Sequence, residues 1–63
     1  MKNHIRFYRE IAGLSQAKLG CVVGVTQQAV DKYERGLMNP SLATIIRLSD
    51  FFEVPVSALF EMD

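Results

Sequence analysis

The fold is decided by one stretch of the sequence, Val25-Thr26-Gln27-Gln28-Ala29-Val30-Asp31-Lys32-Tyr33-Glu34-Arg35-Gly36. Thr26 is a favourable N-cap, and Gly36 is a favourable residue just beyond a helix end. No proline or glycine lies between them to interrupt a helix. The stretch therefore predicts one uninterrupted helix.

One side of this predicted helix carries a mixed set of polar side chains. With about 100° of turn per residue, that side holds Gln27, Gln28, Asp31, Lys32 and Arg35. The opposite side holds Val30, Tyr33 and Glu34, with Ala29 at its edge. A solvated helix face usually consists mainly of glutamate and lysine. Paired glutamines near a helix N-terminus, in contrast, can hydrogen-bond to adenine N6 and N7. A plain solvated face and a base-reading face both remain open on this stretch alone.

Another helix is predicted in residues 14–24, immediately before the helix that begins at Thr26. Ser15 caps it, Gly24 ends it, and the break between the two helices is about three residues, the length of a helix-turn-helix joint. The apolar corner that holds the two helices at a steep angle is expected from Leu19, Val23 and Val25. Gly20 lets the helices approach closely, which offsets the roughly 1 kcal/mol that a glycine costs inside a helix.

Several spaced motifs agree in order along the chain. They are Leu14-Ser15-Gln16, then Leu19, then Gly24-Val25-Thr26-Gln27-Gln28-Ala29-Val30, then Tyr33-Glu34-Arg35-Gly36, and Asn39-Pro40-Ser41-Leu42. Together they are similar to the Cro/repressor-type helix-turn-helix family, also called the XRE family or the lambda-repressor-like fold. The match runs over residues 5–60. The resemblance implies an all-α, compact five-helix lambda-repressor-like bundle, in which helices two and three form the helix-turn-helix.

Length and composition indicate a single domain, residues 1–63. A chain this short has little stability to spare, but 49% of its residues are hydrophobic, which allows a compact core. The single cysteine excludes an internal disulfide and fits a reducing cytoplasm. The N-terminus lacks the apolar run of a signal peptide, and no segment is long and apolar enough to span a membrane.

The sequence offers little for catalysis. His4 is the only histidine, and Cys21 has no neighbouring histidine or cysteine, so an inert thiol is favoured over a nucleophile. There is no glycine-rich phosphate loop and no evident carboxylate pair. We therefore expect no catalytic residue, no metal, no cofactor and no small-molecule site.

The charges are distributed unevenly, although the formal net charge is zero. Residues 1–35 carry six basic and three acidic side chains, a net of +3, and residues 36–63 carry one basic and four acidic side chains, a net of −3. The basic half contains both helices of the expected helix-turn-helix. This asymmetry is the electrostatic footprint that a nucleic-acid partner requires.

The resemblance implies a transcriptional regulator, most simply a repressor, that binds double-stranded DNA as a homodimer at a roughly palindromic operator. Phosphate contacts are expected from Gln16, Lys18, Thr26, Arg35 and backbone amides near Asn39. Base contacts are expected from Gln27, Gln28, Asp31 and Lys32. Gln27 best suits adenine, Lys32 suits guanine, and Asp31 could accept from cytosine N4.

The first helix is expected from about Lys2 or Asn3 to Ala12. Its core stripe is expected to be Ile5, Tyr8 and Ala12. The other apolar residues of this helix, Phe7 and Ile11, either line a contact surface or are scattered exposed groups, which are normal.

The resemblance also implies an ion pair between the first and third helices, formed by Arg9 and Glu34. Glu34 falls on the buried side of its helix, and Arg9 lies beside the core stripe of the first. The role of the pair would be structural, since removal of one partner leaves an uncompensated charge.

Two further helices are expected in the C-terminal half. Ser41 caps the helix Leu42–Phe52, and residues 56–60 form a short last helix after a break at Val54-Pro55. The core positions of these helices are expected to be Leu42, Ile45, Leu48, Ser49, Phe52 and Leu59. The dimer interface is expected from the apolar residues that remain, Phe51, Val56, Phe60 and Met62.

The linker after the central helix departs from the family pattern. It carries Leu37 and Met38, where many relatives have a lysine or arginine that touches phosphate, and a basic residue near Ser41 is also missing. Together with the neutral net charge, this favours an alternative, a protein-interaction module of the same fold such as an antirepressor, an antitoxin or an adaptor. Salt-dependent binding to random duplex DNA separates the two hypotheses.

Overall fold

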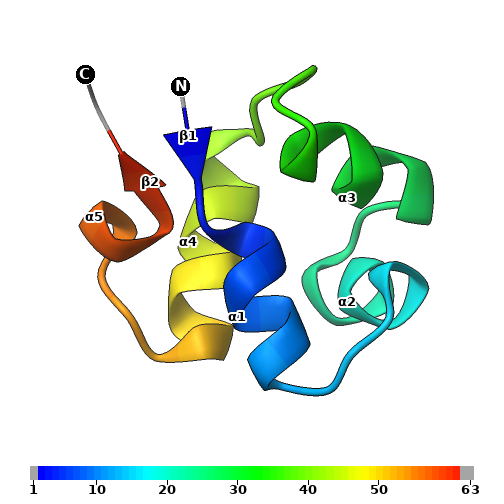
Figure 1. Ribbon diagram of the computed structural model, residues 1–63, viewed down its shortest axis with the longest axis horizontal. Helices are drawn as coiled ribbons and strands as arrows, with labels where there is room; N and C mark the ends of the chain where they lie inside the picture. Colours follow the sequence, from blue (N-terminus) through cyan, green and yellow to red (C-terminus); the bar gives the residue numbers. More distant parts are fainter. Residues whose placement is uncertain (1, 62–63) are drawn as a thin grey trace.

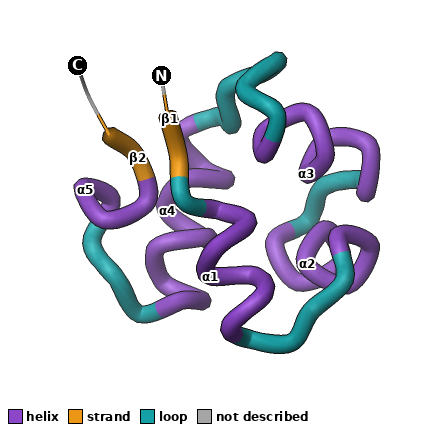
Figure 2. Tube along the Cα trace, in the orientation of Figure 1, coloured by secondary structure: helices purple, strands orange, loops and turns teal. Residues whose placement is uncertain are grey.

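The computed structural model describes residues 2–61, which form five helices joined by short turns, with a short strand at each end (Figure 1). The helices are α1 (Ile5–Ile11), α2 (Gln16–Val23), α3 (Gln27–Glu34), α4 (Leu42–Phe52) and α5 (Val56–Leu59), and the strands are β1 (Lys2–Asn3) and β2 (Phe60–Glu61). The expected all-α, five-helix architecture is confirmed. In Figure 2, α2 and α3 lie together on one side of the molecule, and α5 and β2 lie on the other.

Three of the helices begin at the hydroxyl residues that the sequence indicates. Ser15 accepts a hydrogen bond from the Lys18 backbone N–H at 3.0 Å. Thr26 accepts one from Ala29 at 3.1 Å, and Ser41 accepts one from Thr44 at 3.3 Å. Each hydroxyl satisfies a backbone donor that has no partner within its own helix. The starts of α2, α3 and α4 are therefore encoded locally.

The N-terminal residues differ from the expectation, because Lys2–Asn3 is a strand and α1 begins only at Ile5. The strand β1 pairs antiparallel with β2, with Asn3 opposite Phe60. The side chain of Asn3 holds this arrangement from two sides. Its Nδ2 donates to the Tyr33 carbonyl at 2.8 Å, and its Oδ1 accepts from the Ile5 backbone N–H at 3.2 Å. The chain at Asn3 is thus extended and cannot belong to the helix.

The close approach expected at Gly20 is present. A Cβ atom added to Gly20 would lie 2.6 Å from the Val25 carbonyl oxygen, closer than carbon and oxygen can pack. The same carbonyl belongs to the turn that leads into α3. The backbone N–H of Val25 also bonds to the Gly20 carbonyl at 2.9 Å. The absent side chain therefore lets the turn lie directly on α2 and sets how tightly the two helices meet.

The hydrophobic core draws on every helix. Its buried apolar residues are Ile5, Leu19, Val23, Val30, Tyr33, Leu48, Leu59 and Phe60. Tyr8, Leu14, Val25, Ala29, Ile45, Phe52 and Val54 pack against them. The apolar side of α3, predicted from helical periodicity, is therefore the side that faces the core.

Three of the expected side-chain placements are wrong. Ala12 is exposed because α1 ends at Ile11 and Ala12 lies in the following turn. Leu42 is 73% exposed, because it is the first residue of α4, and the buried residues of that helix begin only at Thr44. Phe60 is buried, with 7% exposure, because it belongs to β2 rather than to the last helix.

One buried polar residue, Thr44, has no counterpart in the sequence-based expectations. It is 5% exposed, and its hydroxyl lies 3.1 Å from that of Ser41. The Ser41 hydroxyl, which caps α4, is thus also the hydrogen-bond partner of the buried Thr44 hydroxyl.

Candidate nucleic-acid interface

The helices α2 and α3 form a compact corner with three residues, 24–26, between them. Gly24 adopts the left-handed conformation, with φ of 78°, and so reverses the chain after α2. The apolar residues expected to hold the corner do so, since Leu19 and Val23 are buried and Val25 packs against them. The two helices are thereby fixed relative to one another, and α3 presents its outer side to solvent.

The outer side of α3 borders a shallow hollow of about 440 Å³. The residues that line the hollow are Gln16, Gln27, Gln28, Asp31, Lys32, Arg35 and Leu37. Six of these seven residues are among those that the sequence assigns to DNA contacts. The structure therefore brings the four expected base-reading side chains and two of the expected phosphate-contacting ones to one surface.

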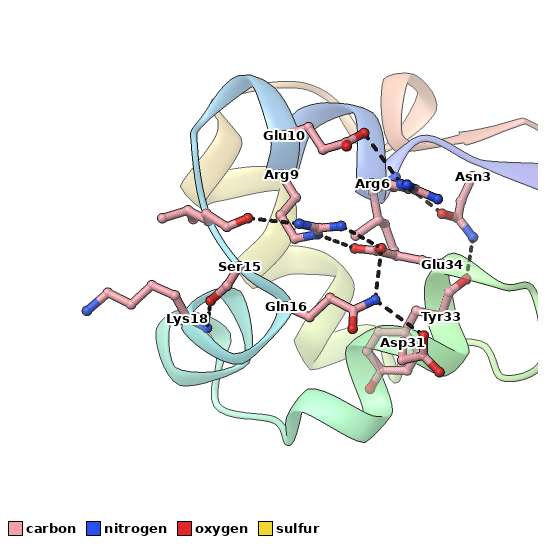
Figure 3. A network of polar contacts seen from close by, with 12 residues as sticks. Asn3, Arg6, Arg9, Glu10, Ser15, Gln16, Lys18, Asp31, Tyr33 and Glu34 are labelled. Atoms are coloured by element: carbon pink, nitrogen blue, oxygen red, sulfur yellow. Dashed lines mark hydrogen bonds and ion pairs between the residues drawn. The ribbon is translucent and has the colours of Figure 1, made fainter.

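Beneath this surface, Arg9 on α1 and Glu34 on α3 form the expected ion pair (Figure 3). Arg9 Nε lies 2.7 Å from Glu34 Oε2, and Nη2 lies 3.1 Å from Oε1. The Arg9 side chain is 13% exposed and that of Glu34 only 4%. The hydrogen bond from Arg9 to Glu34 raises the pKa of Arg9 above its usual value, against an opposing effect of burial. The third donor group of Arg9, Nη1, bonds to the Leu14 carbonyl at 2.8 Å.

Gln16, the first residue of α2, is joined to this pair. Its Nε2 donates to Glu34 Oε1 at 3.2 Å and to Asp31 Oδ1 at 3.3 Å (Figure 3). Both neighbours are carboxylates, so the nitrogen of the amide must be the atom that faces them. An amide nitrogen has two hydrogens, and both are used here. In this arrangement the side chain has no donor left for a phosphate. The backbone N–H groups of Gln16 and Ala17 have no partner within α2, whereas that of Lys18 is donated to the Ser15 hydroxyl.

Asp31 is held from two directions. Its Oδ1 accepts from Gln16, and its Oδ2 accepts from Arg35 Nη1 at 3.3 Å, one helical turn further along α3. The Asp31 side chain is 41% exposed and that of Arg35 is 65% exposed. A carboxylate has about four acceptor positions, so Asp31 retains acceptor capacity toward a base. Its orientation is nevertheless set by its neighbours rather than by solvent.

The helix-turn-helix corner and the helices around it match a known family along nearly their whole length. A model of the helix-turn-helix family matches residues 5–59. The chain belongs to this family. The resemblance to the Cro/repressor-type, or XRE, helix-turn-helix proteins is thereby confirmed, and it covers all five helices.

Relatives of this chain are named as regulators of transcription. An uncharacterized HTH-type transcriptional regulator of Bacillus subtilis is 36% identical over 63 residues, which is the whole of this chain and 96% of the relative. Another from Methanocaldococcus jannaschii is 33% identical and covers 95% of this chain and 91% of the relative. A third from Sinorhizobium medicae is 39% identical over 94% of this chain. The chain spans only 42% of that longer protein.

Two solved structures share the fold. One is the P22 c2 repressor in complex with a synthetic operator, with a TM-score of 0.87 and 30% identity over 95% of this chain and 91% of the other. The second is the restriction-modification controller protein C.AhdI from Aeromonas hydrophila, with a TM-score of 0.80 and 33% identity over 90% and 86% of the two chains. The helix-turn-helix arrangement of α2 and α3 is thus that of known repressor folds.

The remaining expected phosphate contacts lie around the helix-turn-helix without meeting at one point. Lys18 is exposed on α2, and Asn39 is exposed in the linker between α3 and α4. Thr26 already uses its hydroxyl oxygen to cap α3, but a hydroxyl can accept and donate at the same time. None of these three residues lines the hollow.

One member of this surface, Leu37, is expected from the sequence only as a linker residue and not as a base reader. It is 64% exposed and lines the hollow beside the polar side chains of α3. The sequence does contain a signal for its position. An apolar residue directly after a helix-ending glycine commonly folds back on the last turn.

The expected dimer residues separate into two groups. Phe51 and Val56 are 41% and 44% exposed, as an interface residue of a free chain must be. Phe60 belongs to the core of its own chain and cannot form part of that surface. Met62 lies outside the described residues. Phe7 and Ile11, for which the sequence leaves two interpretations open, are 56% and 69% exposed.

Within residues 2–61, no three histidine, cysteine, aspartate or glutamate side chains gather as a metal site would require. Cys21 is an exposed free thiol. No helix in the same part of the chain has the length and apolar character needed to cross a membrane.

Proposed function

We propose that this chain is a sequence-specific DNA-binding regulator of transcription, acting in the cytoplasm as a repressor. One observation carries the proposal: the outer side of α3 gathers Gln27, Gln28, Asp31 and Lys32 at a single exposed surface beside α2. Hydrogen-bonding side chains of these types match the donor and acceptor pattern of the DNA major groove. The names of the relatives and the operator complex of the P22 c2 repressor agree with this assignment.

The contacts would fall into two classes. The side chains of Lys18 and Arg35 and the backbone N–H groups of Gln16 and Ala17 would hold phosphates and set the register of the protein on the duplex. The side chains along the outer side of α3 would reach base edges, with Gln27 and Gln28 at adenine and Lys32 at guanine. Gln16 would act through its backbone N–H, because its side-chain hydrogens are already donated to Asp31 and Glu34.

We further propose a homodimer that binds a roughly palindromic operator. Two α3 helices must lie about 34 Å apart to enter successive major grooves on one face of the duplex. A symmetric interface uses the same patch on both copies. Phe51 and Val56 are the exposed apolar residues at the end of the molecule that holds α5, and they are the candidates for that patch.

Selection of bound duplexes from a random DNA pool tests the proposed function. A regulator of this kind yields one enriched sequence with two related half-sites. It also binds random duplex DNA weakly at low salt, and this affinity falls steeply as salt is added. Failure to bind any duplex at low salt would contradict the proposal.

A second function, a protein-interaction module of the same fold, is favoured by one observation. Leu37, Met38, Leu42 and Ile46 are exposed apolar residues in the linker and the first two turns of α4. The formal net charge of zero also gives no general attraction to DNA. An adaptor would show no salt-dependent binding to duplex DNA, so the same low-salt titration decides between the two functions.

A further inference from the structure

The backbone at the end of α3 fixes Leu37 in a defined position. The Gly36 N–H bonds to the Tyr33 carbonyl at 3.1 Å, and the Leu37 N–H bonds to the Lys32 carbonyl at 2.9 Å. Gly36 itself adopts the left-handed conformation, with φ of 73°. This pair of hydrogen bonds is the Schellman motif, which folds the residue after the glycine back along the final turn of the helix.

An apolar residue at the Leu37 position of this motif normally packs on the residue five or six places before it, within the helix. In this chain those residues are Lys32 and Asp31, both polar. Leu37 is accordingly 64% exposed. Its apolar surface therefore borders the hollow outside α3, which is also lined by Gln27, Gln28 and Lys32.

We propose that Leu37 is a specificity-determining residue that contacts the 5-methyl group of a thymine in the major groove. The methyl group is the apolar feature that thymine alone presents there, and an apolar side chain is the complement for it. The Schellman motif holds the Leu37 backbone in place before binding, so little ordering of the chain is needed. This inference rests on the proposed function, and it adds one base-reading contact that lies beyond the helix itself.

The test replaces thymine by deoxyuridine, which removes only the 5-methyl group. Each thymine of the selected operator is replaced in turn, in both half-sites, and the affinity of the full chain is measured. At one position per half-site the wild-type chain loses affinity about fourfold per methyl group removed. For Leu37→Ala the same replacement changes the affinity less than about twofold. Leu37→Met keeps an apolar side chain of similar length. On the same replacement of thymine by deoxyuridine, this variant should therefore lose nearly as much affinity as the wild-type chain.

Leu42→Ala is the matched control, since Leu42 is also an exposed leucine, at 73%, but does not line the hollow. It should keep the full wild-type response to deoxyuridine, whatever its effect on overall affinity. An equal response in wild type and Leu37→Ala at every thymine overturns the inference alone, because another residue then reads the methyl groups. Absence of any duplex binding by the wild-type chain overturns the proposed function, and the inference with it.

Discussion

Arg9 on α1 holds Glu34, the last residue of α3, through two hydrogen bonds of 2.7 and 3.1 Å. The same carboxylate accepts a third hydrogen bond from Gln16 on α2. Glu34 is therefore fixed from two helices at once, at 4% exposure. The buried carboxylate links the stability of the bundle to the side chains that face the hollow, because Gln16 continues the network to Asp31.

Removal of Arg9 should destabilise the chain severely. Arg9→Ala leaves Glu34 buried without its charged partner, which costs about 3 kcal/mol or more, measured as the free energy of unfolding in urea. Arg6→Ala is the control, because the Arg6–Glu10 pair is exposed over more than half of each side chain and contributes about 0–1 kcal/mol at most. Arg9→Met combined with Glu34→Leu should recover much of the loss. An unchanged denaturation midpoint for Arg9→Ala would show that the pair contributes nothing.

Gln16→Met should affect DNA discrimination more than DNA affinity in general. The substitution frees the Asp31 carboxylate from one of its two donors, so the operator complex should weaken by about 1 kcal/mol, while binding to random DNA should stay nearly constant. A side chain that held phosphate would instead weaken binding equally on both DNAs. Asp31→Ala should also shift the NMR signal of the Gln16 side-chain NH₂ group in the free protein, and Lys32→Ala should not.

The glutamines of α3 should separate base contacts from phosphate contacts. Gln27→Ala or Gln28→Ala should cost about 1–3 kcal/mol on the selected operator and little on random DNA. Lys18→Ala and Arg35→Ala serve as the comparison, because removal of a phosphate-binding side chain weakens binding to both DNAs alike and reduces the salt dependence by about one unit for each such side chain. Equal losses of affinity on both DNAs for the glutamine variants would favour the protein-interaction module.

Asp31→Asn should raise binding to random DNA and reduce discrimination at one base pair. The change removes a negative charge that repels the DNA backbone and releases Arg35 from its 3.3 Å ion pair with the carboxylate. Affinities for operator and random DNA at two salt concentrations measure both effects. Unchanged binding to random DNA would show that the released Arg35 does not reach a phosphate.

Dimerisation should depend on the end of the molecule that holds α5. Val56→Asp or Phe51→Ser should shift the chain toward monomer in sedimentation experiments, because a polar or charged group opposes burial of this apolar surface. Val22→Ser is the control and should leave the assembly unchanged, because Val22 is 41% exposed but belongs to α2, on the side of the molecule opposite α5. A wild-type chain that stays monomeric at high micromolar concentration, with and without DNA, would contradict the proposed dimer.

The sequence is sufficient to predict the features that depend on neighbouring residues. Ser15, Thr26 and Ser41 begin their helices through bonds to residues three positions later, and helical periodicity identifies Val30 and Tyr33 as core. Such signals are local and can be read without knowledge of the rest of the chain.

The features that the sequence did not reveal depend on residues far apart. Asn3 is extended because it pairs with Phe60 and bonds to Tyr33, and neither partner is visible from its neighbours. The pairing of β1 with β2 also directs the Phe60 side chain into the core. Gln16 could be placed at the start of a helix from sequence, but its two acceptors lie 15 and 18 residues away. The orientation of α2 against α3 decides which donors remain for DNA.

The pairing of β1 with β2 brings residues 2–3 beside residues 60–61, so the two ends of the described chain lie next to one another. A linker of a few residues could join these strands, and new ends could then be opened in an exposed turn such as the one between α3 and α4. The paired strands lie away from α2 in Figure 1. A further domain attached through β2 would therefore leave the outer side of the helix-turn-helix uncovered.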